Sequence, residues 1–142
     1  MKRAMTLIGL LLLIIGGAML YIRLAPSDPA RWHVDPLSTP DPATPNFARL
    51  NLMLTVPPDT VAARLSAHAE AEGGQRLAGD ARHSTWLMRT PLMGYPDFVS
   101  VRLIPEAGGT RVVALSRSRF GHSDLGVNAA RLARWQDALQ AD

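Results

Sequence analysis

The chain has 142 residues, no cysteine, and 15 lysines and arginines against 12 aspartates and glutamates. This length allows one domain at most, and the lack of cysteine excludes disulfides and thiolate chemistry. The net charge of +3 arises at the start of the chain, because setting aside Lys2, Arg3 and Arg23 leaves 12 basic and 12 acidic residues. The remainder is neutral and lacks lysine, so we expect no nucleic-acid partner and no polybasic lipid-binding surface.

An uncharged apolar segment runs from Ala4 to Ile22. A helix of these 19 residues would be about 28 Å long, close to the hydrocarbon thickness of a bilayer. Tyr21 lies at its end, where an aromatic ring prefers the membrane interface. The alternative is a cleavable signal peptide, whose apolar core is shorter, about 7 to 15 residues. We expect residues 1–23 to be a retained anchor that contacts the lipid bilayer through residues 4–22.

Basic residues flank the apolar segment on both sides. Lys2 and Arg3 precede it together with the amino terminus, and Arg23 and Arg31 follow it. This distribution favours an N-terminus in the cytoplasm. The expected location is therefore the inner (plasma) membrane, with a single pass and a periplasmic, or more generally extracytoplasmic, C-terminal domain.

Proline dominates residues 24–46. This composition predicts an extended, fairly stiff linker that rises about 3.1 Å per residue. Trp32 and Val34 could dock on the domain or on lipid headgroups, and the sequence does not decide between these sites. A fragment that begins at about residue 44 is expected to fold alone. The prolines are Pro26, Pro29, Pro36, Pro40, Pro42 and Pro45.

Residues 47–142 are expected to form the folded domain. Apolar and polar residues alternate between residues 50 and 56, a pattern typical of a half-buried strand. Similar patterns predict three more strands at residues 83–90, 98–104 and 110–118. Three consecutive strands with short connections favour an antiparallel sheet.

Two helices complete the expected domain. The first begins at Asp59 or Thr60 and ends at about Glu72, before two glycines. The second begins near Ser123 or Asp124 and continues to the end of the chain. The order is strand, helix, three strands, helix. It predicts a small α+β fold with about four antiparallel strands and both helices on one face, preceded by one transmembrane helix.

The last helix has apolar residues at spacings of three and four. This periodicity places Leu125, Ala129 and Leu132 on its inner stripe and Arg131 on its outer side. In the strand before the helix, side chains alternate between the two faces of the sheet. We therefore expect the serines at positions 116 and 118 on one face and the arginines at positions 117 and 119 on the other.

The corner between this strand and this helix, residues 116–131, contains most of the candidate site residues. The positive end of a helix beside two arginines and His122 is typical of an anion site. The same groups could instead fasten the corner, with Asp124 as a helix cap and the arginines paired with acidic residues. The candidate ligand-binding or clasp residues are Asp97, Ser116, Arg117, Ser118, Arg119, His122, Ser123, Asp124, Asn128 and Arg131.

A small hydrolase is an alternative, with Ser118 or Ser123 as nucleophile and His122 as base. The adjacent residues His122, Ser123 and Asp124 make a poor catalytic triad, because neighbouring side chains diverge whereas a triad is hydrogen-bonded in series. The four histidines show no paired spacing typical of zinc ligands. We expect no metal and no cofactor.

Two segments resemble domain-of-unknown-function family 1499. They are Arg89-Thr-Pro-Leu-Met-Gly-Tyr-Pro-Asp97 and Ser116-Arg-Ser-Arg-Phe-Gly-His-Ser-Asp-Leu-Gly-Val-Asn128, with Arg131 after the second. The resemblance covers about residues 47–140, and His122 departs from it where the family commonly has tyrosine. It implies a bacterial envelope or plastid protein, often with an N-terminal export or membrane segment, and brings no established activity. It also implies that Asp97 and the corner form one spatial unit.

These observations together favour a binding or accessory module in the cell envelope. The candidate partners are an anionic small molecule, a lipid and an envelope protein. Besides the hydrolase, the other alternative is a structural subunit of a membrane complex. A solvent-open cleft at the corner would favour a binding module or a hydrolase, and a closed corner beside an exposed apolar sheet face would favour the structural subunit.

Overall fold

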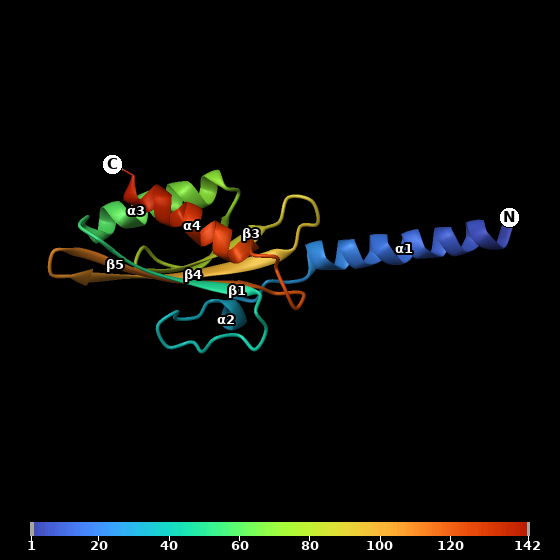
Figure 1. The fold of residues 1–142 in the computed structure, drawn as a ribbon, viewed down its shortest axis with the longest axis horizontal. Coiled ribbons are helices and arrows are strands. Elements are labelled where there is room, and N and C mark those ends of the chain that lie inside the picture. The colour runs from blue at the N-terminus through green and yellow to red at the C-terminus, as the bar shows by residue number, and fades with distance from the viewer. Residues whose placement is uncertain (1, 142) are drawn as a thin grey trace.

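One antiparallel sheet organises the chain after its first helix, as Figure 1 shows. The computed structural model describes residues 2–141. Helices α3 and α4 lie against one face of the sheet, and α1 extends away from one end of it. The elements are α1 (Lys2–Leu24), α2 (Pro29–Trp32), β1 (Phe47–Leu54), α3 (Pro58–Ala71), β2 (Gln75–Gly79), β3 (His83–Arg89), β4 (Pro96–Glu106), β5 (Gly109–Ser118) and α4 (Val127–Gln140).

The strand order is β1-β5-β4-β3-β2, and every neighbouring pair is antiparallel. The predicted α+β class and antiparallel sheet are confirmed, but the sheet has a fifth strand, β2, which the sequence did not predict. This strand is short, lies at the edge and is largely exposed. Its pairing with β3 is interrupted between Arg76 and Ala78. Because only one side of β2 has a partner strand and little of it is buried, it has no alternating apolar pattern.

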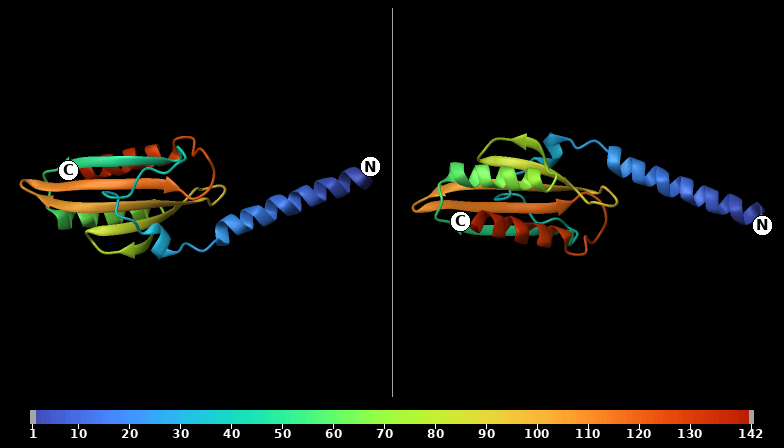
Figure 2. Two further views of the ribbon diagram at one scale, coloured as in Figure 1. Left: turned by 90° about the horizontal axis from the view of Figure 1, so that it is seen from below. Right: turned by 90° about the horizontal axis from the view of Figure 1, so that it is seen from above.

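The main core lies between the sheet and the two helices. Trp86 and Val99 of the sheet are fully buried there, together with Leu65 of α3 and Trp135 of α4. Alternate residues of each strand point to this layer, as the pleat requires. Figure 2 shows both helices on the same face of the sheet, so this prediction is also confirmed.

Helix α4 differs from the prediction at its first turn. It begins at Val127, and Leu125 precedes it in a left-handed conformation (φ 53°) with its side chain 94% exposed. Ala129 is exposed as well, whereas Arg131, which was expected on the outer side, is only 4% exposed. The prediction was wrong here because hydrophobic periodicity detects only apolar side chains, and the first inward-facing positions of this helix are polar.

Residues 25–46, which we call the strap, lie across the face of the sheet opposite α3 and α4. Helix α2 of the strap appears below the sheet in Figure 1. The ring of Trp32 stacks on the ring of Phe98 with 4.1 Å between centroids and 11° between planes. Leu87 completes this second, smaller core. The expected extended spacer is therefore folded back, because the apolar residues on this face of the sheet need cover from water.

Hydrogen bonds hold the strap along its length. His33 Nδ1 lies 2.8 Å from Thr85 Oγ1 in β3. The Arg49 side chain of β1 donates to Asp41 Oδ1 at 2.6 Å and to the carbonyl oxygen of Thr39 at 2.6 Å. These contacts give the proline-rich segment one defined path over the sheet.

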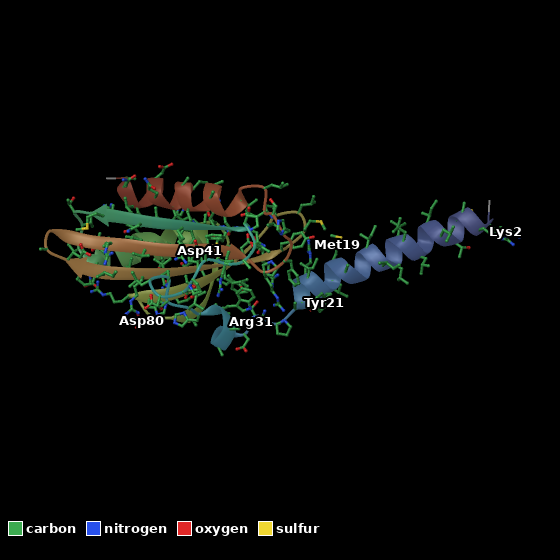
Figure 3. The ribbon with its side chains drawn as sticks, turned by 60° about the horizontal axis from the view of Figure 1, so that its bottom comes forward. Lys2, Met19, Tyr21, Arg31, Asp41 and Asp80 are labelled. Atoms are coloured by element: carbon green, nitrogen blue, oxygen red, sulfur yellow. The ribbon has the colours of Figure 1, made fainter. Side chains whose placement is uncertain are left out.

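Helix α1 has 23 residues, none of them buried. Among residues 2–141 it is the one helix long and apolar enough to cross a membrane, a property that a signal sequence shares. Its last turn contacts the domain. Arg23 Nη2 donates to the carbonyl oxygen of Leu92 at 3.0 Å, and the Tyr21 and Phe120 rings meet edge to face at 6.2 Å. Figure 3 places Tyr21 at the domain end of the helix.

Candidate functional site

A buried polar cluster fastens α4 to the sheet. Arg131 Nη2 donates to Asp97 Oδ2 at 2.7 Å, and its Nη1 donates to Asn128 Oδ1 at 2.9 Å and to Ser116 Oγ at 3.1 Å. The sheet register explains the position of Asp97, because it pairs with Ser118 of β5 and shares the helix-facing side with it. Asp97 and Arg131 therefore form an ion pair that is removed from water.

Asn128 lies at the centre of this cluster and is fully buried. Its Nδ2 donates to Asp124 Oδ2 at 2.7 Å, to Ser118 Oγ at 2.9 Å and to the carbonyl oxygen of Asn46 at 3.1 Å. Its Oδ1 accepts from Ser116 Oγ at 2.5 Å. A buried network of this kind is rigid when its members are satisfied, and a lost member leaves others without partners.

Asp124 caps the first turn of α4. Its Oδ2 accepts from the backbone amide of Asn128 at 2.8 Å, and its Oδ1 accepts from the amide of Gly126 at 3.1 Å. Burial raises the pKa of Asp124, but the hydrogen bonds from Asn128 and Gly126 outweigh it and hold the pKa below its ordinary value. The Asp124 carboxylate thus accepts hydrogen bonds from the backbone amides that a bound anion would need.

The arginines of the candidate anion site lie elsewhere. The Arg117 guanidinium is 4.8 Å from the centre of the Trp32 ring, on the strap side of the sheet. Burial there, and then the charge of Arg31, lower the pKa of Arg117. Arg119 Nη1 donates to the carbonyl oxygen of Pro26 at 2.6 Å. The structure does not bring either arginine to the start of α4.

His122 and Ser123 are exposed in the corner. Ser123 Oγ accepts from the backbone amide of Leu125 at 3.3 Å, and Ser118 Oγ is bound to Asn128. Within residues 2–141, no hydrogen bond joins His122 to either serine, and no group of three or more acidic or histidine side chains could hold a metal ion. The hydrolase alternative therefore lacks an assembled nucleophile and base.

The structure thus brings six of the ten candidate residues into one cluster and leaves four outside it. Asn46 belongs to the cluster but was not predicted from the sequence. It is 3% exposed, and its Nδ2 donates to the carbonyl oxygen of Gly121 at 2.7 Å. A single asparagine after a proline-rich segment gives no signal of such a role. The clustered residues are Asp97, Ser116, Ser118, Asp124, Asn128 and Arg131, and the others are Arg117, Arg119, His122 and Ser123.

A pocket of about 690 Å³ lies beside the cluster, at the end of the domain where α1 arrives. It is lined by residues 90–95, the loop before β4, and by residues 118–127, from the end of β5 to the start of α4, and Ile22 of α1 contributes to its wall. Figure 2 shows both loops at this end. The volume suits a small-molecule ligand. The apolar lining residues are Ile22, Pro91, Leu92, Met93, Tyr95, Phe120, Leu125 and Val127.

The polar part of the pocket wall is acidic. Asp97 and Asp124 both line it, with Ser118, Ser123 and Thr90. Asp97 Oδ1 is buried and has no hydrogen-bond partner among the described residues. No lysine or arginine is among the described residues that line this pocket. The pocket therefore combines an apolar wall with a carboxylate oxygen that has no hydrogen-bond partner among the described residues.

A smaller hollow of about 460 Å³, which Arg131 lines, lies between α4 and the end of β3. Met88, Ala130 and Arg134 are among its lining residues. Arg134 is held by Glu72, with Nε donating to Oε1 at 2.6 Å. Of the described residues, none from α1 lines this hollow, so it lacks the connection to α1 that distinguishes the larger pocket.

A family model described as "Protein of unknown function (DUF1499)" matches residues 23–139. No curated protein has a matching sequence. Among solved structures, protein MLL2253 from Mesorhizobium loti has a TM-score of 0.52 at 12% identity over 66% of this chain and 93% of its own. The likeness at this identity shows the fold alone.

Two further solved structures have lower TM-scores. Protein CV1439 from Chromobacterium violaceum is 17% identical, with a TM-score of 0.41 over 68% of this chain and 93% of its own. Protein TTHA0849 from Thermus thermophilus is 14% identical, with a TM-score of 0.36 over 66% of this chain and 93% of its own.

Proposed function

The chain belongs to the DUF1499 family, whose function is unknown, and we propose from its geometry that it is a membrane-anchored module that binds an amphiphile taken from the bilayer. The pocket at the junction of α1 and the domain is the observation that carries this proposal. In this proposal α1 spans the inner membrane with its N-terminus in the cytoplasm, and the domain lies in the periplasm.

The position of the pocket supports a ligand from the membrane. Arg23 at the end of α1 is hydrogen-bonded to the loop that carries Leu92. Leu92 is 80% exposed and Leu125 is 94% exposed, and both line the pocket. With α1 in a bilayer, these two side chains lie at the membrane surface, where apolar groups are stabilised by lipid. The mouth of the pocket then faces the lipid from which an amphiphile enters.

The anchor can be tested with the full chain. A C-terminal alkaline phosphatase fusion is expected to be active, because Lys2 and Arg3 keep the N-terminus in the cytoplasm. The protein is expected to remain in the membrane fraction after high-salt washing, since an apolar helix is not released by screening charges. Recovery of a soluble protein that begins near residue 26 would show instead that α1 is a cleaved signal sequence.

The ligand can be tested by native mass spectrometry of the full-length protein extracted from membranes in mild detergent. We expect one bound lipid or lipid-like molecule on the wild type and a loss of most of it from Val127→Trp, because Val127 lines the pocket and an indole there would fill it. Ala133→Trp is the matched control, since Ala133 is exposed on the same helix outside the pocket lining. Equal lipid on all three proteins would place the lipid around α1 and contradict the pocket proposal.

A further inference from the structure

Only one of the two carboxylate oxygens of Asp97 has a hydrogen-bond partner among the described residues. Its Oδ2 accepts from Arg131 Nη2 at 2.7 Å, whereas its Oδ1 has no partner among the described residues. Asp97 is 1% exposed and lies in the wall of the pocket. A buried acceptor without a hydrogen bond is costly, so a ligand group that donates to Oδ1 would gain a stabilising interaction that the free protein lacks.

The charge around this oxygen disfavours anions. Asp124 is a second carboxylate in the same wall. The guanidinium of Arg131 is bound to Asp97 Oδ2, and Arg131 does not line the pocket. Arg119 is directed to the carbonyl oxygen of Pro26. An anionic headgroup in the pocket would therefore meet the carboxylate oxygens of Asp97 and Asp124, which accept hydrogen bonds and cannot donate them, and no cation from the described lining residues.

We infer that the pocket selects amphiphiles whose headgroup carries an N–H or O–H donor, such as a primary ammonium or a hydroxyl, and that this group donates to Asp97 Oδ1. This inference rests on the proposed function. It names the chemical class of the ligand, and it replaces the anionic ligand expected from the two arginines of the corner. The acyl chain of the amphiphile lies against Leu92, Phe120 and Val127 at the mouth.

The test uses the full-length protein in nanodiscs of phosphatidylcholine, whose headgroup has no N–H or O–H donor. Three soluble probes with the same octyl chain are titrated by calorimetry: octylammonium, octyltrimethylammonium and octyl sulfate. Nanodiscs with the Val127→Trp protein give the background from partition into lipid. Octylammonium is expected to bind about tenfold or more tightly than octyltrimethylammonium, the effect of one charge-assisted hydrogen bond. Octyl sulfate is expected to bind weakest.

Two variants separate the hydrogen bond from the charge. Asp124→Asn removes a charge but keeps a capping side chain. It is therefore expected to weaken the binding of both cationic probes and to leave the ratio of their affinities unchanged. Asp97→Asn is expected to abolish the preference for octylammonium over octyltrimethylammonium. If Asp97→Asn does not fold, the affinities of the three probes for the wild type and for Asp124→Asn still test the inference.

The outcomes distinguish this inference from the function on which it rests. Equal affinities for the two cations, or tighter binding of octyl sulfate, would overturn the donor inference and leave the pocket as a binding site. Binding of no probe above the Val127→Trp background would contradict the proposed function itself.

Discussion

Replacement of Arg131 by alanine is expected to lower the free energy of unfolding by about 3–5 kcal/mol. The substitution leaves the carboxylate of Asp97 buried without its cation, and it removes donors from Ser116 Oγ and Asn128 Oδ1. The cost arises mainly from these stranded groups, because the desolvation of a buried charge is not recovered when its partner is lost. Urea unfolding of the full-length protein in detergent, followed by tryptophan fluorescence, measures it.

Arg134→Ala is the matched control on the same helix. Arg134 also pairs with a carboxylate, that of Glu72, at 2.6 Å, but its side chain is 54% exposed. Burial raises the pKa of Glu72, but hydrogen bonds from Arg134 and Trp135 outweigh it and keep the pKa below its ordinary value. Water screens this pair, so we expect a loss of about 1 kcal/mol or less. Similar losses for both variants would show that the burial of Arg131 has no special energetic role.

A double substitution tests why Arg131 is needed. The ion pair itself could stabilise the fold, or Arg131 could be needed only because Asp97 would otherwise be buried without a partner. Well-packed apolar residues often replace a buried ion pair at little cost. The double variant Asp97→Leu with Arg131→Leu is therefore expected to be more stable than Arg131→Ala. A double variant no more stable than Arg131→Ala would instead show that the unpaired carboxylate of Asp97 is not the main cost of losing Arg131.

Much of the layered fold could be predicted because it follows from apolar periodicity. Alternation between residues 50 and 56 and around Val99, Val101 and Leu103 indicated strands, and the structure has β1 and β4 there. The main core buries this set of β4 residues against the helices. The resemblance to family 1499 also implied that Asp97 and residues 116–131 form one spatial unit, and the structure places Asp97 Oδ2 2.7 Å from Arg131 Nη2. Local patterns and the family resemblance were sufficient for these features.

Other features depend on partners far along the chain, which local patterns do not reveal. Arg131 is polar, so periodicity assigned it to solvent, although three polar partners are buried with it. The prolines of the strap indicated a spacer, because composition alone does not show that Phe98 and Leu87 on the far face of the sheet need cover. The pocket was not predicted, since it forms only where two loops and the end of α1 meet.

The strap gives the second large expected effect. Trp32→Ala is expected to lower the free energy of unfolding by about 3–5 kcal/mol, the usual range for a buried aromatic residue. Trp32 is 7% exposed and stacks on Phe98, and the Arg117 guanidinium lies over its ring. Its loss would open a cavity over β4 and expose Leu87. The change is measured by urea unfolding of the full-length protein in detergent.

Leu37→Ala is the control within the strap, because Leu37 is 49% exposed and a surface substitution usually changes stability by about 0.5 kcal/mol or less. A fragment that begins at residue 44 lacks Trp32 and most of the strap. We therefore expect it to be less stable than the full chain by at least the effect of Trp32→Ala, and to bind a dye that reports exposed apolar surface. A fragment as stable as the full chain would show that the strap is the dispensable linker that its composition indicated. If the fragment instead unfolds, the strap is part of the domain, since the apolar face under Trp32 then needs it for cover.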